Sequence, residues 1–241
     1  MRNYVAIFAV IVFVLTFLGS EASAGGSCNN KLNQCIKEKN RKCPVVVGPS
    51  KDAFKKNLPQ DFCNSRKGDG KLRQANGTQI LTGVCSNTPQ GEIPKVENMP
   101  STLIISPFDG QKFKRNKPFT VTTITKNLQL GFFSDAVNNY NTFPQKLNKK
   151  GIIQGHQHIT IQYLGKDRNS LEFPSALEFA FFKGLNDPSK NGKLSVSVDD
   201  GLKRPGIYRC CTIISSFSHQ PVVLPKAQRG ASDDCVRFQV I

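Results

Sequence analysis

Three histidines are the residues of this chain whose type and spacing best suit metal chemistry. His156 and His158 alternate with Gln157 in a segment rich in strand-forming residues, so both imidazoles should leave one face of a strand about 7 Å apart. His219, the third histidine, lies in a polar, turn-like segment much later in the chain. Three imidazole nitrogens would suit zinc or copper if the fold brought them together. The alternative is three histidines with ordinary hydrogen bonds and no metal.

Eight cysteines are the second chemically informative set. Cys210 and Cys211 are adjacent in a predicted strand, so their side chains should leave opposite faces and need different partners. The inward one could meet Cys235 and the outward one Cys85. The sequence has no Cys-x-x-Cys pair, which favours disulfides over a zinc site. We expect two separate sets of paired cysteines: Cys28, Cys35, Cys43 and Cys63 in the first, and Cys85, Cys210, Cys211 and Cys235 in the second.

Other catalytic machinery is not evident in the sequence. It contains no Gly-x-Ser-x-Gly segment, no His-Glu-x-x-His segment and no phosphate-binding glycine loop. The acidic pairs Asp199-Asp200 and Asp233-Asp234 are adjacent residues in predicted turns, so neither forms a facing acid–base couple. Spacing alone does not exclude a Ser–His–Asp site, because triad members can be distant in sequence. We interpret the chain as a non-enzyme.

Residues 1–24 have the features of a cleavable signal peptide. Arg2 precedes a short apolar run, which is followed by Ala22-Ser23-Ala24, the small-x-small pattern that signal peptidase cuts. The run is shorter than the roughly 20 apolar residues of a spanning helix, although an uncleaved anchor is the alternative. We therefore expect a secreted, extracellular protein without a membrane anchor, in a compartment where cysteines pair. The sequon at Asn76 predicts one glycosylation site.

The remaining chain divides into two regions of different texture. Residues 25–95 are basic and cysteine-rich, with one short helical pattern near Cys28 and Cys35. Residues 96–241 contain about seven short β-rich segments separated by Gly, Pro, Asn and Asp, which predicts an all-β, immunoglobulin-like antiparallel β-sandwich. The predicted strands are residues 102–105, 118–125, 152–163, 177–182, 194–198, 206–214 and 235–241.

The formal net charge of +16 predicts attraction to acidic partners. Nucleic acid, anionic polysaccharide, acidic lipid and acidic protein surfaces all fit this charge, and so does a soluble basic protein with non-specific binding only. Nucleic acid is disfavoured, because no nucleic-acid-binding motif appears and aromatic residues are not interleaved with the basic ones.

Several segments carry a resemblance to known proteins. Gly155-His156-Gln157-His158-Ile159 resembles a Gly-His-x-His-Ile segment of fungal secreted proteins, and Pro205-Gly206-Ile207-Tyr208-Arg209 also fits that group. Together with the cysteine-rich N-terminal region, the chain is similar to the rust transferred proteins of biotrophic rust fungi. That resemblance implies secretion from haustoria, transfer into the host cytoplasm or nucleus, glycosylation, self-assembly into filaments and inhibition of cysteine proteases.

Three functional hypotheses follow from these features. The first is a secreted effector that binds a host protein, with inhibition of a papain-like cysteine protease as the narrower version. The second is a structural or filament-forming matrix protein, with the uncharged β-formers of residues 179–182 and 212–214 as pairing segments if they lie on an exposed edge. The third is a metal-binding module built on His156, His158 and His219.

Overall fold

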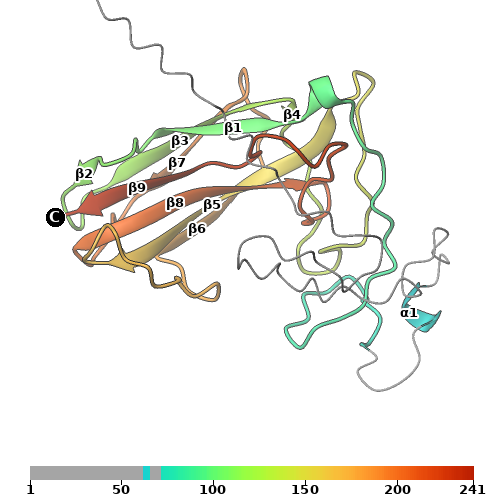
Figure 1. Ribbon diagram of the computed structural model, residues 1–241, viewed down its shortest axis with the longest axis horizontal. Coiled ribbons are helices and arrows are strands. Elements are labelled where there is room, and N and C mark those ends of the chain that lie inside the picture. Colours follow the sequence, from blue (N-terminus) through green and yellow to red (C-terminus); the bar gives the residue numbers. More distant parts are fainter. Residues whose placement is uncertain (1–61, 66–71) are drawn as a thin grey trace, which may run out of the picture. The chain divides into compact units, whose positions relative to one another are not determined.

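The computed structural model describes residues 62–65 and 72–241, all within one compact unit that begins at Leu58. The regular secondary structure of this region is almost entirely β, as the alternating sequence pattern predicts (Figure 1). Its strands are β1 Ser101–Ser106, β2 Lys112–Phe113, β3 Phe119–Lys126, β4 Leu128–Gln129, β5 Ile153–Gly165, β6 Phe181–Leu185, β7 Lys193–Val198, β8 Gly206–Ser216 and β9 Cys235–Val240. Two short helical turns precede them, α1 Phe62–Ser65 and a 3₁₀ turn at Val96–Asn98. The helix expected near Cys28 lies outside the described residues.

The strands form two sheets that pack into a β-sandwich. One sheet has the order β1-β3-β7, and the other has the order β2-β9-β8-β5-β4 with β6 beside β5. All the longer pairs are antiparallel, and only the two-residue strands β2 and β4 pair in parallel. The seven predicted strands are present within a few residues of their predicted bounds. Strands β2 and β4 are too short to leave a periodic signal, and the sequence does not predict them.

Alternation along β5 separates a core face from an outer face. Ile159 and Ile161 point between the sheets and pack with Tyr208 and Phe238 from the neighbouring strands. His156 and His158 occupy the opposite face, because successive residues of a strand point to opposite sides. His156 and His158 therefore share one face of β5, as the sequence predicts.

Within the described residues, no helix is both long and apolar enough to span a membrane.

Candidate metal centre

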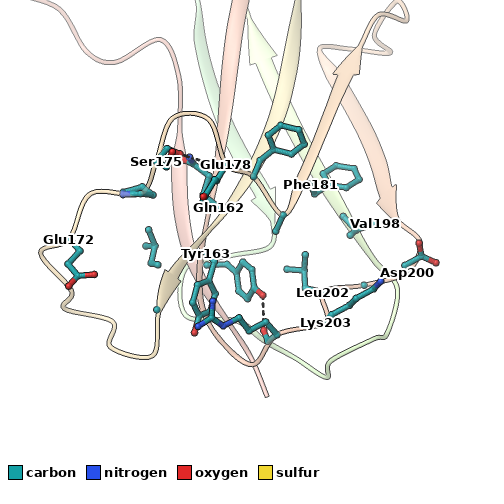
Figure 2. Close-up of a pocket in the computed structure, with 18 of the residues that line it drawn as sticks. Gln162, Tyr163, Glu172, Ser175, Glu178, Phe181, Val198, Asp200, Leu202 and Lys203 are labelled. Atoms are coloured by element: carbon teal, nitrogen blue, oxygen red, sulfur yellow. Dashed lines mark hydrogen bonds between the residues drawn. The ribbon is translucent and has the colours of Figure 1, made fainter.

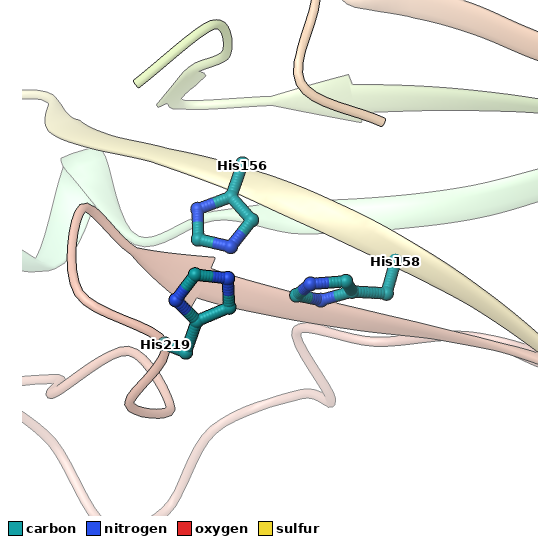
Figure 3. Close-up of side chains that lie close together, drawn as sticks. All are labelled: His156, His158 and His219. Carbon is teal, nitrogen blue, oxygen red and sulfur yellow. The ribbon is translucent and has the colours of Figure 1, made fainter. Parts of the chain in front are cut away.

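The three histidines predicted as metal ligands lie together on the outer face of the larger sheet. One ring nitrogen from each lies within 4.8 Å of the other two (Figure 3). The ring centroids of His156 and His219 are 4.6 Å apart, and those of His158 and His219 are 5.4 Å apart. The spatial condition for a shared site is therefore met, while metal binding itself stays a prediction.

Strand pairing and one loop place these rings. His156 and His158 lie opposite Ser215 and Ile213 in the antiparallel β5–β8 pair. The chain leaves β8 at Ser216 and turns back, so His219 comes to lie over β5. The backbone N–H of His219 donates a hydrogen bond of 2.8 Å to the Tyr140 carbonyl, which ties this turn to the loop of residues 131–144.

Gly155 permits the close approach of β5 and β8 beside the site. A Cβ atom at this position would overlap the Ser215 carbonyl oxygen and also press on Leu128. Glycine is thus required by contact rather than by a positive φ angle. This gives the glycine of the Gly-His-x-His segment a physical role next to the first histidine.

Hydrogen bonding fixes the tautomer of His156. Its Nδ1 atom is 3.1 Å from the Phe132 carbonyl oxygen, which can only accept, so Nδ1 carries the proton. The Nε2 lone pair is then free, the arrangement in which a metal-binding histidine is oriented by a backbone carbonyl. His156 Nε2 and His219 Nδ1 are two of only four buried side-chain polar atoms in the described residues that lack a hydrogen-bond partner.

Burial keeps the cluster neutral. Desolvation, followed by the neighbouring His158 and His219, lowers the pKa of His156 from 6.5 to about 3. Desolvation and then His219 lower the pKa of His158 to about 4, and desolvation also lowers the pKa of His219. All three imidazoles are therefore unprotonated at neutral pH, the form that binds a metal.

Aromatic side chains surround the histidines. Tyr140 stacks on His219 with centroids 5.2 Å apart, Phe182 stacks on His158 at 5.3 Å, and Phe133 meets His156 edge-on at 6.2 Å.

A tetrahedral zinc ion with bonds of about 2.0–2.1 Å holds its nitrogens roughly 3.4 Å apart. The ring nitrogens must therefore approach one another by up to about 1.4 Å on binding, and His219, which is the least buried and lies on a loop, is the ring best able to move.

The cysteines pair differently from the prediction. Cys63 bonds to Cys85, which joins the two sets that were expected to be separate. Cys211 bonds to Cys235, directly opposite on β9, and it does so from the outer face that also carries the histidines. The inward-pointing Cys210 is a buried free thiol in the core, so its predicted disulfide is wrong. Cys28, Cys35 and Cys43 lie outside the described residues.

The acidic pair Asp233-Asp234 accepts hydrogen bonds from neighbouring strands. Asp233 accepts hydrogen bonds from the Thr212 hydroxyl and the Ile214 N–H, and burial raises its pKa. Asp234 accepts from the Ile104 N–H and thereby links β1 to the larger sheet.

Asn76 is exposed, and its side-chain oxygen accepts from the Thr78 hydroxyl, so the sequon is accessible while glycosylation stays a prediction.

Of the two predicted pairing segments, one is already hydrogen-bonded on both sides. Residues 212–214 pair with β5 and lie beyond the end of the β8–β9 pairing at Cys211 and Cys235. On that side the Thr212 N–H donates to the Asp234 carbonyl and the Ile214 N–H donates to the Asp233 carboxylate, so neither N–H is open for pairing at an edge. Residues 181–182 begin β6, which pairs with β5, and Phe179 and Phe182 are exposed there. Only this second segment fits the filament hypothesis.

A second candidate site was not predicted from the sequence. The loop of residues 166–180, between β5 and β6, borders a cavity of about 1080 Å³ (Figure 2). Leu171, Phe173 and Leu177 on this loop are 93, 98 and 90% exposed. No periodic pattern marks the loop, and an apolar residue in a sequence is ordinarily read as core.

Three comparisons with known proteins bear on this chain. Residues 102–241 match the family model described as the CLU5d N-terminal domain. The chain is 44% identical over 169 residues to pathogenicity cluster 5 protein d of Colletotrichum graminicola. That match covers 68% of this chain and 34% of the relative, so the chain spans about a third of the relative's length.

Among solved structures, superoxide reductase (neelaredoxin) from Ignicoccus hospitalis matches at 12% identity and a TM-score of 0.27, covering 58% of this chain and 80% of that one. A second structure of that enzyme matches at 11% identity and a TM-score of 0.28, covering 61% and 87%. These likenesses bear on neither the fold nor the function.

Proposed function

The chain belongs to the family of the CLU5d N-terminal domain, and from this premise we propose that its sandwich is the transition-metal-binding module of a fungal pathogenicity-related protein. The observation that carries the proposal is the convergence of three neutral imidazoles, two of which present buried nitrogens without a hydrogen-bond partner.

A bound metal would offset the desolvation penalty of the unpartnered ring nitrogens in the cluster. A buried polar atom that loses its water without gaining a partner destabilises the fold by about 1–3 kcal/mol. This penalty arises when β5 and the His219 turn fold, because folding desolvates the rings before any ligand is present. A metal ion coordinated by His156 and His219 would give these unpartnered nitrogens a partner, and removal of their desolvation penalty would favour metal binding.

Zinc and copper are the metals that fit the donor set. Imidazole nitrogen suits both ions, and no fourth His, Cys, Asp or Glu joins the cluster among the described residues. A metal held here would keep at least one coordination position for an outside ligand.

Metal analysis of protein purified without a histidine tag tests the proposal directly. We expect one equivalent of zinc or copper per chain after dialysis, and titration of stripped protein should show a single site. His158→Gln and His219→Gln should each weaken binding by roughly 100-fold or more, because each removes a ligand. Gln220→Asn, in the same turn as His219, is the matched control and should bind like the wild type. A wild-type protein that takes up neither metal would end the proposal.

Host-protein binding is the second candidate, and the exposed loop of residues 166–180 favours it. The Gln162 amide donates to the carbonyls of Ser175 and Glu178, so the base of the loop is fixed while its apolar side chains remain in solvent. Large exposed apolar groups on a rigid base are typical of interaction sites. We propose that this loop enters an apolar cleft of a host protein, with papain-like cysteine proteases as the class to test.

Inhibition assays against papain distinguish specific binding through the loop of residues 166–180 from non-specific hydrophobic adsorption. The wild type should inhibit at micromolar concentration, and Phe173→Ser should abolish inhibition. Leu81 is equally exposed at 98% but lies outside this loop, so Leu81→Ser is the matched control and should keep full inhibition. Absence of inhibition by the wild type would remove the protease version of the proposal.

A further inference from the structure

A turn at the β2–β3 connection carries four exposed positive charges in six residues. Lys112, Lys114, Arg115 and Lys117 are all exposed, and Phe113 is the one partly buried residue within 112–117. Figure 1 shows this turn at the end of the sandwich where β9 also ends. We call residues 112–117 the basic turn.

The aromatic core holds the basic turn in place. Phe113 stacks on Phe119 with centroids 4.4 Å apart and meets Phe238 edge-on at 5.6 Å. Because Phe113 is anchored inward, the residues on either side of it point outward. The Arg115 N–H also donates to the Ile241 carbonyl at 2.9 Å, so the backbone beneath the charges is fixed.

A second turn, residues 199–204, abuts the basic turn and adds two cations. The Asn116 N–H donates to the Leu202 carbonyl at 3.0 Å, and a Cβ at Gly201 would overlap the Lys117 backbone, so the two turns are in direct contact. Lys203 is exposed, and the Arg204 guanidinium lies 4.0 Å from the centre of the Tyr163 ring. Figure 2 shows Lys203 and Tyr163 beside the cavity described above.

These cations have no ionic partners of their own. In the part of the chain that the structure describes, one salt bridge forms, between Arg168 and Asp109, and it uses none of them. Asp199 and Asp200 are exposed in the second turn but form no salt bridge with Lys203 or Arg204, and the basic turn itself contains no acidic residue. Fixed like charges that are not paired internally favour an external polyanion.

We propose that the basic turn and Lys203 form a binding site for an anionic polysaccharide. A single-stranded nucleic acid would be held by exposed rings that stack on its bases, but Phe113 is stacked in the core and Tyr163 is covered by Arg204. Insertion into a membrane surface would need apolar side chains at the turn tip, and the tip consists of Lys114, Arg115, Asn116 and Lys117. A sulfated or carboxylated sugar chain needs only a fixed row of cations, which is what the two turns present.

Titration with a heparin oligosaccharide and with oligogalacturonate tests this site. We expect binding that weakens steeply between low and physiological salt, because screening shortens the reach of exposed charges. The triple variant K114S/R115S/K117S should weaken binding roughly tenfold or more. A DNA duplex and anionic phospholipid vesicles, run in parallel, should bind less tightly than the sugar chains.

A charge-matched variant separates a site from net charge alone. K146S/K149S/K150S removes three positive charges from the segment next to β4 and should leave sugar binding within about twofold of the wild type. Equal losses in the two triple variants would overturn the proposal, and so would tighter binding of DNA or vesicles. Every substituted residue is exposed, so both variants should fold like the wild type. Circular dichroism of both variants checks that a loss of binding is not caused by unfolding.

Discussion

The Nδ1 atom of His156 lies 3.1 Å from the backbone carbonyl oxygen of Phe132, a residue 24 positions earlier in the chain. This contact orients the ring and directs Nε2 toward His158 and His219. It also makes the loop of residues 131–144 part of the site, although that loop contributes no metal ligand. The chemistry of the cluster therefore depends on a segment without any chemical motif of its own.

Stability should fall on acidification because of the buried histidines. The pKa values of His156 and His158 in the folded state, about 3 and about 4, lie below the ordinary 6.5 of an unfolded chain. Between about pH 6.5 and 4 the unfolded state binds more protons, so the free energy of unfolding should decrease by about 1.4 kcal/mol per pH unit for each histidine. Urea unfolding of metal-free protein at pH 7 and pH 5 measures this change.

The variant H156Q/H158Q is the control for that pH dependence. It should be less stable at neutral pH, yet its unfolding free energy should change less between pH 7 and 5 than that of the wild type. Equal slopes for the two proteins would mean that other groups cause the acid sensitivity.

Substitution of Gly155 should damage both the fold and the metal site. In Gly155→Ala the new methyl group meets the Ser215 carbonyl, so β5 and β8 must separate next to His156. We expect a loss of roughly 1–3 kcal/mol in unfolding free energy, as for other overpacked positions, and weaker metal binding. Gly230 has open space around its Cα, so Gly230→Ala should be neutral in the same thermal and metal-titration measurements.

The thiol of Cys210 should be chemically inert in the folded protein. The side chain is fully buried, and desolvation followed by Asp234 raises its pKa to about 12. Iodoacetamide should therefore label one thiol fewer in Cys210→Ser than in the wild type under denaturing conditions, but equal numbers under native conditions. A difference of one equivalent in native buffer would show that the core opens or that this thiol is exposed.

Loss of the β8–β9 disulfide should destabilise the sandwich without dismantling it. Cys211 and Cys235 are 24 residues apart, and a crosslink over a loop of this size stabilises by about 3 kcal/mol through the unfolded ensemble. The double variant C211S/C235S should lose that much in denaturant unfolding. Its metal affinity should be nearly unchanged, because the β5–β8 pairing that places the histidines does not involve this bond.

Local patterning was enough to predict most strands and the shared face of His156 and His158. A strand repeats every two residues, so a short segment carries its own evidence of which side chains point inward. The same rule correctly predicted that Cys210 and Cys211 would have different surroundings. It did not predict which of them would pair, and the expected cysteine sets were wrong at Cys63 and Cys85.

Tertiary structure alone decided what those local features do. His219 lies over β5 because of the turn after β8 and because its backbone N–H donates a hydrogen bond to the Tyr140 carbonyl. His219 and Tyr140 are 79 positions apart in the sequence (219 minus 140). The low pKa values of the histidines come from burial under loops that have no periodic signal. Pairing, burial and convergence are properties of segments distant in sequence, because they arise only when the chain packs as a whole. The residue types were present in the sequence, and the packing made them a site.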